Sequence, residues 1–320
     1  MRIGYFLSCE EQTPAALVEQ ARLAEQAGFD GLWISDHYHP WNHEQGQSPF
    51  VWSVIGALSQ VTGLEVTTAV TCPTIRIHPA IVAQAAATAT VMCPGGFRLG
   101  VGSGEALNEH VTGARWPTAD VRLEMLEEAV DVIRRLVGGE TVTHHGPHYT
   151  VEDAQLYTRP DEVMPVLVSG FGPKAIELAG RIADGFVTTM PDPDARESYR
   201  AAGGRGPAVA GAKVCYGADR DHAVATAHRL WANTGVPGEL AQVLPSPAHF
   251  EQASQLVTPE MIGDALPCGP DLDHHVEKLR AYADAGYDEL YISQIGPTSP
   301  EFFKVYEREV LPELRRIAGS

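Results

Sequence analysis

The chain has 320 residues, of which 44% are hydrophobic, and this is enough to bury either one large core or two ordinary ones. Its 41 acidic residues outnumber the 23 basic residues and give a formal net charge of −18 at pH 7. Such a negative surface repels phosphate backbones and anionic lipids, so we expect neither a nucleic-acid partner nor a membrane partner.

Cysteine use and the apolar segments indicate where the protein works. The five cysteines are widely spaced and include no Cys-x-x-Cys pair, which favours a reducing, cytoplasmic compartment. The first 12 residues lack the apolar core of a signal peptide. No apolar run reaches the roughly 20 residues that a bilayer span needs, so we expect a cytoplasmic protein.

Short β-branched or aromatic runs alternate with longer segments of helical period along the whole chain. In chain order, the predicted strands are 3–7, 31–35, 66–70, 97–101, 166–169, 185–188, 214–217 and 289–293. The predicted helices between them include 14–27, 79–92, 121–137, 173–182, 221–233 and 272–285. This alternation, without a break in composition, predicts one α/β domain over residues 1–320, a (β/α)8 TIM barrel.

Two predicted connections are longer than ordinary strand-to-helix loops. They cover residues 36–48 and 235–270, and the second contains a predicted helix at 247–256. We expect both to be insertions at the C-terminal face of the strands. Active sites of such barrels are built from the loops at this face, so residues that directly follow strands are the candidates for function.

The segment after the second predicted strand, residues 35–43, reads Ser-Asp-His-Tyr-His-Pro-Trp-Asn-His. His37 supplies a group that gains or loses a proton near neutral pH, Asp36 stands beside it, and Trp41 offers a wall for a flat ligand. A lone histidine in a loop is usually a surface residue. Three histidines, an acid and a tryptophan together at a strand end favour a functional site.

A glycine-rich segment, residues 100–105, follows the fourth predicted strand and reads Gly-Val-Gly-Ser-Gly-Glu. Alternate glycines let the backbone approach a ligand closely, and Glu105 then stands at the barrel mouth as a candidate acid. The spacing is not that of the G-x-G-x-x-G dinucleotide fingerprint. From spacing alone, a plain structural turn is an equal alternative.

The segment after the fifth predicted strand runs Ser-Gly-Phe-Gly-Pro-Lys over residues 169–174 and leads straight into a helix. Free N–H groups and the positive end of a helix dipole bind phosphate, so this segment is the predicted anion site. The alternative is an ordinary capped turn. At the end of the third predicted strand, Cys72 has no neighbouring charge in sequence that would make it reactive.

Taken together, these segments resemble the luciferase-like (β/α)8 flavin and deazaflavin oxidoreductases. They are most similar to the branch of glucose-6-phosphate dehydrogenases that use coenzyme F420. The resemblance is carried by SDHYHPW (35–41), GVGSGEALNE (100–109), SGFGP (169–173) and AGRIADGF (179–186), and the segment order agrees over nearly the whole chain. It implies coenzyme F420 as cofactor, hydride transfer as reaction, and a homodimer.

The resemblance also implies roles for individual residues. His37 matches a proton acceptor for the substrate hydroxyl, Trp41 a residue that stabilises the transition state, and Glu105 a proton donor to the reduced ring. A bulge with a non-prolyl cis peptide, which lies behind the ring in the family, would fall at 69–70. The expected cofactor-binding residues are Asp36, Ala69, Val70, Cys72, Gly104, Asn108, Ser169, Gly170, Phe171, Gly172 and Pro173.

The expected substrate site departs from the sugar-phosphate branch. Its residues are expected to be Glu10, Thr189, Asp192 and Trp231. Three basic residues hold the substrate phosphate in that branch, whereas the aligned positions here are Asp192 and, less securely aligned, Ala241 and Ala265. An aspartate repels a phosphate dianion. We therefore predict a neutral or weakly charged alcohol, hemiacetal or carbonyl substrate without a phosphate group.

Other readings remain open from sequence. FMN could replace F420, as in luciferase-like monooxygenases, or the enzyme could run as a reductase with reduced F420, since sequence does not fix the direction of hydride flow. A metal-dependent hydrolase is a second class, because His37 and His39 form a His-x-His after a strand; its further ligands would come from His43, Asp184, His274 and His275. A binding protein without chemistry would not need His37 and Glu105. We assign no metal site.

Overall fold

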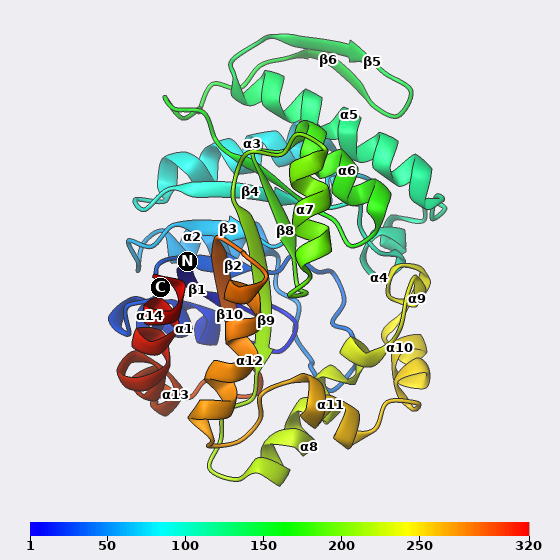
Figure 1. Ribbon diagram of the computed structural model, residues 1–320. Helices are drawn as coiled ribbons and strands as arrows, with labels where there is room; N and C mark the ends of the chain where they lie inside the picture. The colour runs from blue at the N-terminus through cyan, green and yellow to red at the C-terminus, as the bar shows by residue number, and fades with distance from the viewer. Residues whose placement is uncertain (320) are drawn as a thin grey trace.

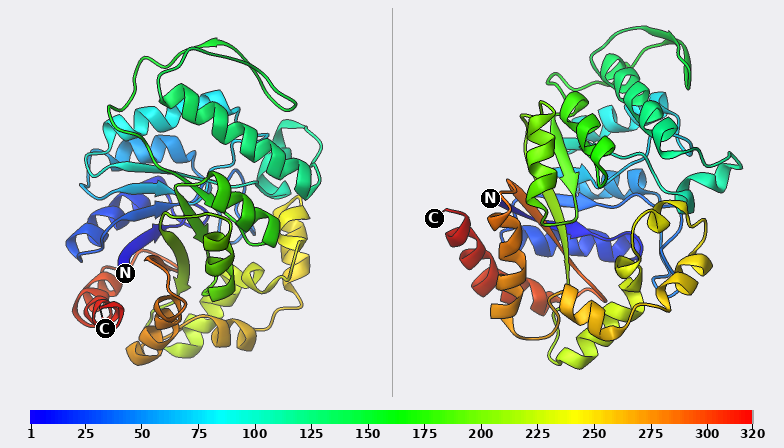
Figure 2. Two further views of the ribbon diagram at one scale, coloured as in Figure 1. Left: turned by 45° about the horizontal axis from the view of Figure 1, so that its top comes forward. Right: turned by 45° about the vertical axis from the view of Figure 1, so that its right-hand side comes forward.

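Eight parallel strands close into a barrel in the computed structural model, which describes residues 1–319. Around the barrel their order is β1-β10-β9-β8-β7-β4-β3-β2, and helices surround it (Figures 1 and 2). The predicted (β/α)8 barrel is thereby confirmed. Its strands are β1 (Arg2–Leu7), β2 (Leu32–Ile34), β3 (Val66–Thr68), β4 (Phe97–Val101), β7 (Val166–Ser169), β8 (Gly185–Thr188), β9 (Ala208–Val214) and β10 (Glu289–Gln294).

Helices connect the strands and form the outer layer. The helices of the first half are α1 (Pro14–Gln26), α2 (Val51–Leu58), α3 (Pro79–Met92), α4 (Ala106–Glu109), η1 (His110–Thr112), α5 (Ala119–Val137) and α6 (Pro173–Ile182). Those of the second half are α7 (Pro193–Ala201), α8 (Arg220–Trp231), η2 (Ala232–Gly235), α9 (Leu240–Val243), α10 (Pro247–Ser254), α11 (Pro259–Ala265), α12 (Leu272–Asp284), α13 (Pro300–Val305), η3 (Tyr306–Val310) and α14 (Leu311–Ala318). None of the helices in residues 1–319 has the length and apolar character to cross a membrane.

Large aromatic rings fill the barrel interior because glycines on neighbouring strands leave room for them. Trp33 of β2 and Tyr291 of β10 stack with ring centroids 4.6 Å apart. A Cβ on Gly211 of β9 would lie 2.9 Å from the Trp33 ring, and one on Gly4 of β1 would lie 2.1 Å from the Tyr291 ring. Packing of this density makes the interior a core rather than a pore.

The same small residues explain the one strand whose predicted position was wrong. We predicted the seventh barrel strand at 214–217, but β9 covers Ala208–Val214. Its sequence, Ala-Val-Ala-Gly-Ala-Lys-Val, is poor in the β-branched and aromatic residues that mark strands. The opposing rings, and not intrinsic strand preference, select these residues.

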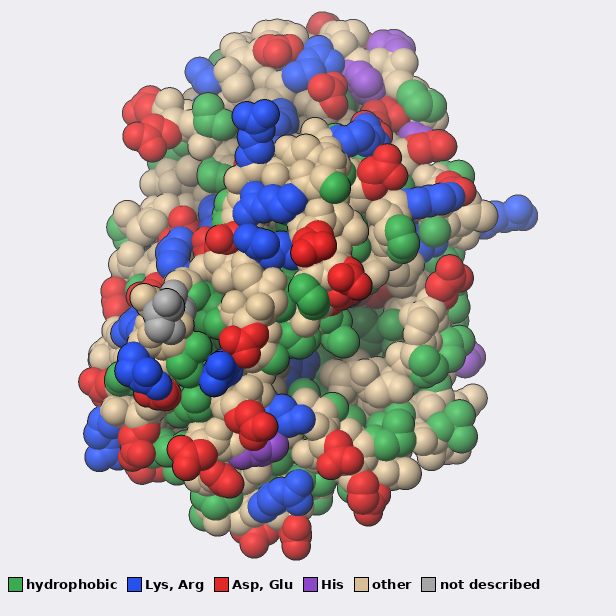
Figure 3. Space-filling view, viewed as in Figure 1, with side chains coloured by type: hydrophobic (Ala, Val, Ile, Leu, Met, Phe, Trp, Pro, Cys, Tyr) green, Lys and Arg blue, Asp and Glu red, His purple; other side chains and the backbone are tan. Residues whose placement is uncertain are grey.

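Two features outside the barrel bear on the site. The hairpin of β5 (Val142–His145) and β6 (Thr150–Ala154), which the sequence analysis did not foresee, lies beyond α5 at the top of Figure 1. The 235–270 segment folds into short helices, with α10 close to its predicted bounds. These helices lie on the hollowed face in Figure 3, where hydrophobic side chains gather.

Candidate active site

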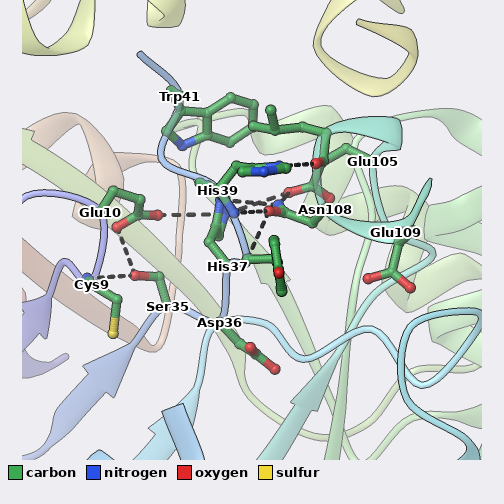
Figure 4. Close-up of polar contacts among 12 residues, drawn as sticks. Cys9, Glu10, Ser35, Asp36, His37, His39, Trp41, Glu105, Asn108 and Glu109 are labelled. Atoms are coloured by element: carbon green, nitrogen blue, oxygen red, sulfur yellow. Dashed lines mark hydrogen bonds and ion pairs between the residues drawn. The ribbon is translucent and has the colours of Figure 1, made fainter. Parts of the chain in front are cut away.

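Three loops that follow barrel strands bring the candidate catalytic residues together. His37 follows β2, Glu105 follows β4 and Glu10 follows β1, and Figure 4 shows their side chains pointing toward one another. The Nε2 atom of His37 lies 3.4 Å from Oε1 of Glu10 and 3.5 Å from Oε1 of Glu105. The imidazole therefore sits between two carboxyl groups, which stabilise it when it carries a second proton.

Asn108 holds the loop that carries His37. Its Oδ1 accepts hydrogen bonds from the backbone N–H groups of Tyr38 (2.9 Å) and His39 (3.0 Å). These bonds turn its Nδ2 toward Nδ1 of His37, at 3.0 Å, and toward Oε1 of Glu105, at 3.2 Å. When Nδ1 donates to the carbonyl of His39, 3.2 Å away, Nε2 of the neutral imidazole carries no proton and can accept one, while Nδ2 of Asn108 donates to Glu105.

Glu10 is buried beside His37 and is held by two hydroxyl groups. Its Oε2 accepts hydrogen bonds from Ser8 and Ser35, each at 2.8 Å, and this leaves Oε1 facing the imidazole. Burial raises the pKa of Glu10, but His37, Lys213 and the Ser35 hydroxyl outweigh it, so the pKa lies below its usual value. The lowered pKa favours the anionic form of Glu10 next to the imidazole of His37.

Trp41 forms one wall of the site. Its ring centroid lies 5.0 Å from that of His37, and its backbone N–H donates to Oε1 of Gln45 at 2.7 Å. Asn42 and Gln45 both donate to the carbonyl of Leu230 at the end of α8, at 2.9 and 2.8 Å. The 36–48 loop is thus attached to the second half of the barrel.

Two apolar residues, Ala69 and Val70, follow the end of β3. A cis peptide joins Ala69 and Val70, as the resemblance implied. Both residues are half-buried and pack on the aromatic rings inside the barrel. A Cβ on Gly102 would lie 2.8 Å from Cγ2 of Val70, so glycine on the β4 side is what lets the bulge fit.

Two further acids, Asp36 and Glu109, bind residues of the segment 71–76, which follows the bulge. Oδ1 of Asp36 pairs with Nη2 of Arg76 and its Oδ2 accepts from the Thr71 hydroxyl, both at 2.8 Å. Oε2 of Glu109 accepts from the Arg76 N–H at 2.8 Å. Burial raises the pKa of Cys72 in this segment well above its usual value, which agrees with an unreactive thiol.

The predicted anion site follows β7, the strand that pairs with β4. Gly172 precedes Pro173 at the start of α6, and no side chain caps the helix. Phe171 is 58% exposed at this site. A Cβ on Gly170 would lie 2.9 Å from the backbone of Ala175, so the turn demands glycine. Uncapped N–H groups at a helix start suit a phosphate.

Two of the four predicted substrate residues, Glu10 and Trp231, lie near Lys213. Glu10 is the partner of His37 described above. The Thr189 carbonyl accepts from the Tyr282 hydroxyl at 3.1 Å, and the Asp192 carboxylate caps α7 by accepting from the Asp194 N–H at 2.9 Å. Trp231 is buried, with its indole N–H donating to Oε1 of Glu11 at 3.1 Å.

Sequence reasoning missed Lys213 at the C-terminal end of β9. Its ammonium lies 3.5 Å from the ring centroid of Trp231. No hydrogen bond or ion pair to Lys213 occurs within residues 1–319, so its donors are free for water or a ligand. The misplaced strand hid this residue, because a correct β9 would have put a lysine at a strand end.

The His-x-His segment does not gather metal ligands. Nδ1 of His39 lies 2.9 Å from the carbonyl of Leu107, and His43 pairs with Glu251. In the part of the chain that the structure describes, no three His, Cys, Asp or Glu side chains are grouped as a metal site requires.

Known proteins share this arrangement over the whole chain. The model of the luciferase-like monooxygenase family matches residues 1–289. An F420-dependent glucose-6-phosphate dehydrogenase of Microbacterium testaceum is 37% identical and aligns over 99% of this chain and 98% of its own. One of Nakamurella multipartita is 36% identical, over 100% and 98%.

A solved structure is also similar to this chain. An F420-dependent secondary alcohol dehydrogenase in complex with an F420-acetone adduct superposes with a TM-score of 0.90 at 34% identity, covering 98% of this chain and 99% of that one. With the family match and relatives that align almost end to end, the chain belongs to the luciferase-like monooxygenase family.

Proposed function

We propose that the protein is a coenzyme F420-dependent oxidoreductase that moves a hydride between a C–OH carbon of its substrate and the cofactor. The observation that carries the proposal is an imidazole set between two carboxyl groups, beside a flat bulge at the barrel mouth. The aligned relatives named above are F420-dependent dehydrogenases that act on sugar or alcohol hydroxyls.

The cofactor site fits an elongated ligand with a flat ring and an anionic tail. Ala69 and Val70 would support the ring, and the uncapped start of α6 at Gly172 would receive the phosphate of the tail. Ser169, Gly170, Phe171 and Pro173 would line that end, with Asp36, Cys72, Gly104 and Asn108 nearer the ring. Coenzyme F420 supplies a deazaflavin that accepts two electrons as hydride and reacts poorly with oxygen.

The protein's part in the reaction is to hold the donor carbon and manage protons. Nε2 of His37 accepts the proton of the substrate hydroxyl as the hydride leaves the adjacent carbon, and the Glu10 carboxylate stabilises the resulting imidazolium. Glu105, with a side chain 21% exposed on the other side of the imidazole, would donate the proton that the cofactor ring takes up together with the hydride. Trp41 closes the site over His37 and limits water.

We further propose a substrate without a phosphate group. The names of the most similar relatives do not support this, since they are glucose-6-phosphate dehydrogenases, whereas the similar alcohol dehydrogenase was solved with an acetone adduct. Two features of this chain favour it: Asp192 aligns with one of the cations of the sugar-phosphate branch, and Lys213, at the end of β9, lies near Glu10 and Glu11. A dianion would meet net negative charge there.

The test is reduction of F420 by purified protein, followed by the loss of its absorbance, with glucose, glucose-6-phosphate and 2-propanol as substrates. We expect turnover with an unphosphorylated compound and little with the phosphate. Micromolar KM for glucose-6-phosphate would refute the substrate proposal, and binding of FMN in place of F420 would refute the cofactor. His37→Asn should lower kcat by about 10²- to 10⁴-fold, as for loss of a general base, with F420 binding unchanged.

The oligomeric state and the cellular compartment of the protein are also proposals. We propose that the protein acts as a homodimer, on the strength of the family resemblance, and in the cytoplasm, on the strength of its cysteine use. Light scattering on the purified protein measures its mass in solution, and a monomer at working concentration would overturn the dimer.

A further inference from the structure

Helix α10, yellow in Figure 1, brings two adjacent residues against the loop that carries Trp41. Phe250 meets the Trp41 ring edge to face, with centroids 5.0 Å apart and planes at 82°. Oε1 of Glu251 accepts hydrogen bonds from the backbone N–H of His43 at 2.9 Å and from its Nδ1 at 2.8 Å. The inserted segment therefore supports the wall of the site from outside.

The aromatic contact is the stronger of the two. The side chains of His43 and Glu251 are 69% and 41% exposed, so solvent screens their attraction. Phe250 is 1% exposed and makes a buried ring contact, which combines apolar burial with a favourable edge-to-face geometry. Removing Phe250 would therefore disturb Trp41 more than removing the ion pair would.

The Trp41 side chain has no polar anchor of its own. Its indole N–H makes no hydrogen bond within residues 1–319, in contrast to the indole of Trp231, which donates to Glu11. The bonds from Gln45 and Asn42 hold the backbone of the loop but leave the ring to be oriented by packing. The ring packs on the buried cluster that contains Trp231, and its two aromatic ring contacts are with His37 and Phe250.

We propose that Phe250 is a positioning residue that holds the Trp41 indole against His37. The inference rests on the proposed function only in assigning Trp41 to the active site; the contact itself is independent of it. The inserted segment 235–270 then does more than cover the barrel mouth, because it sets the orientation of a residue that borders the reacting atoms.

A double-mutant cycle tests the proposal. Phe250→Ala should lower kcat about tenfold or more, because small displacements of residues at the reacting atoms cost up to about 10²-fold, while the affinity for F420 stays unchanged. In a Trp41→Phe background, the same substitution should change kcat by less than about twofold. Phe250→Leu should restore part of the rate, and Phe302→Leu, a buried phenylalanine away from the site, serves as the control for packing loss.

Equal losses of kcat with and without Trp41 would overturn the inference, since they would mean that Phe250 acts through general stability. A second readout needs no activity. The part of the tryptophan emission that is lost in Trp41→Phe should shift toward longer wavelength in Phe250→Ala. If the wild type reduces no F420 but the Trp41 emission shifts in Phe250→Ala, the proposed function is wrong and the positioning role of Phe250 holds. If the emission does not shift in Phe250→Ala, Phe250 does not position Trp41.

Discussion

Glu11 offers a test of how the buried charges around the site affect stability. Its Oε1 accepts from the Trp231 indole at 3.1 Å and its Oε2 accepts from the Gly296 N–H at 2.9 Å. Burial raises its pKa to about 7, even though these two bonds and Lys213 favour the ionised form. The perturbation is Glu11→Gln, which leaves a side chain of the same shape that is uncharged at every pH.

The magnitude follows from the difference between the folded and unfolded states. In the unfolded chain the carboxyl has its usual pKa of 4.5, whereas in the folded protein the pKa is about 7. The folded state therefore binds more protons between these values, so its stability is complete below pH 4.5 and is lost as the pH rises through 7. Since one pKa unit corresponds to about 1.4 kcal/mol, the loss amounts to about 3 kcal/mol.

The assay is urea unfolding of wild type and Glu11→Gln at pH 4.5, 7 and 8.5. The amide of Glu11→Gln has one acceptor fewer, which lowers the free energy of unfolding by about 1 to 3 kcal/mol at every pH. The test is therefore how the difference in the free energy of unfolding between the variant and wild type changes with pH. Relative to wild type, the variant should gain about 3 kcal/mol between pH 4.5 and pH 8.5. Glu19→Gln, at an exposed position on α1, should show no such trend. If the difference in the free energy of unfolding between wild type and Glu11→Gln is the same at pH 4.5 and at pH 8.5, the raised pKa of Glu11 is refuted.

Two further substitutions test the cofactor seat and the barrel core. Gly102→Ala places a Cβ 2.8 Å from Cγ2 of Val70 and should weaken F420 affinity about tenfold or more in a fluorescence titration, whereas Gly56→Ala, with no atom within 4 Å, should bind as wild type. Glu289→Gln removes the charge of one of the two carboxylates that Arg98 contacts, since Glu65 also lies 3.0 Å from its Nε, and should lower the free energy of unfolding in urea by about 1.5 to 3 kcal/mol. A loss below about 1 kcal/mol would mean that water solvates the arginine.

Helices and strands with a characteristic sequence signal could be predicted to the residue. Helix α3 begins at Pro79 after a capping His78, and α6 begins at Pro173 after Gly172, because proline fits the first helical turn. Strand β4 is a short, fully buried run that reads clearly from its composition. The hairpin of β5 and β6 was not predicted, since its residues alternate weakly and its anchor, Glu128, lies on another element.

The polar part of the site was predictable for a related reason. His37 and Glu105 follow predicted strands directly, and the closed barrel brings strand ends to one face, so the two were expected near each other before any contact was known. Their roles in the reaction stay predictions, as does the contact of Asp192 and Trp231 with a substrate. Glu10 emerged as the partner of His37 only from the geometry.

The apolar support of the site could not be read from the chain. Phe250 is one phenylalanine in a segment without a motif, and its importance arises from contact with Trp41, more than 200 positions earlier. The polar residues proposed to handle protons follow strands of the first half of the barrel, whereas the support for Trp41 comes from the insertion in the second half. From this division we infer that changes within 235–270 reach the reaction through Trp41, whereas changes within 36–48 act on His37 and Trp41 directly.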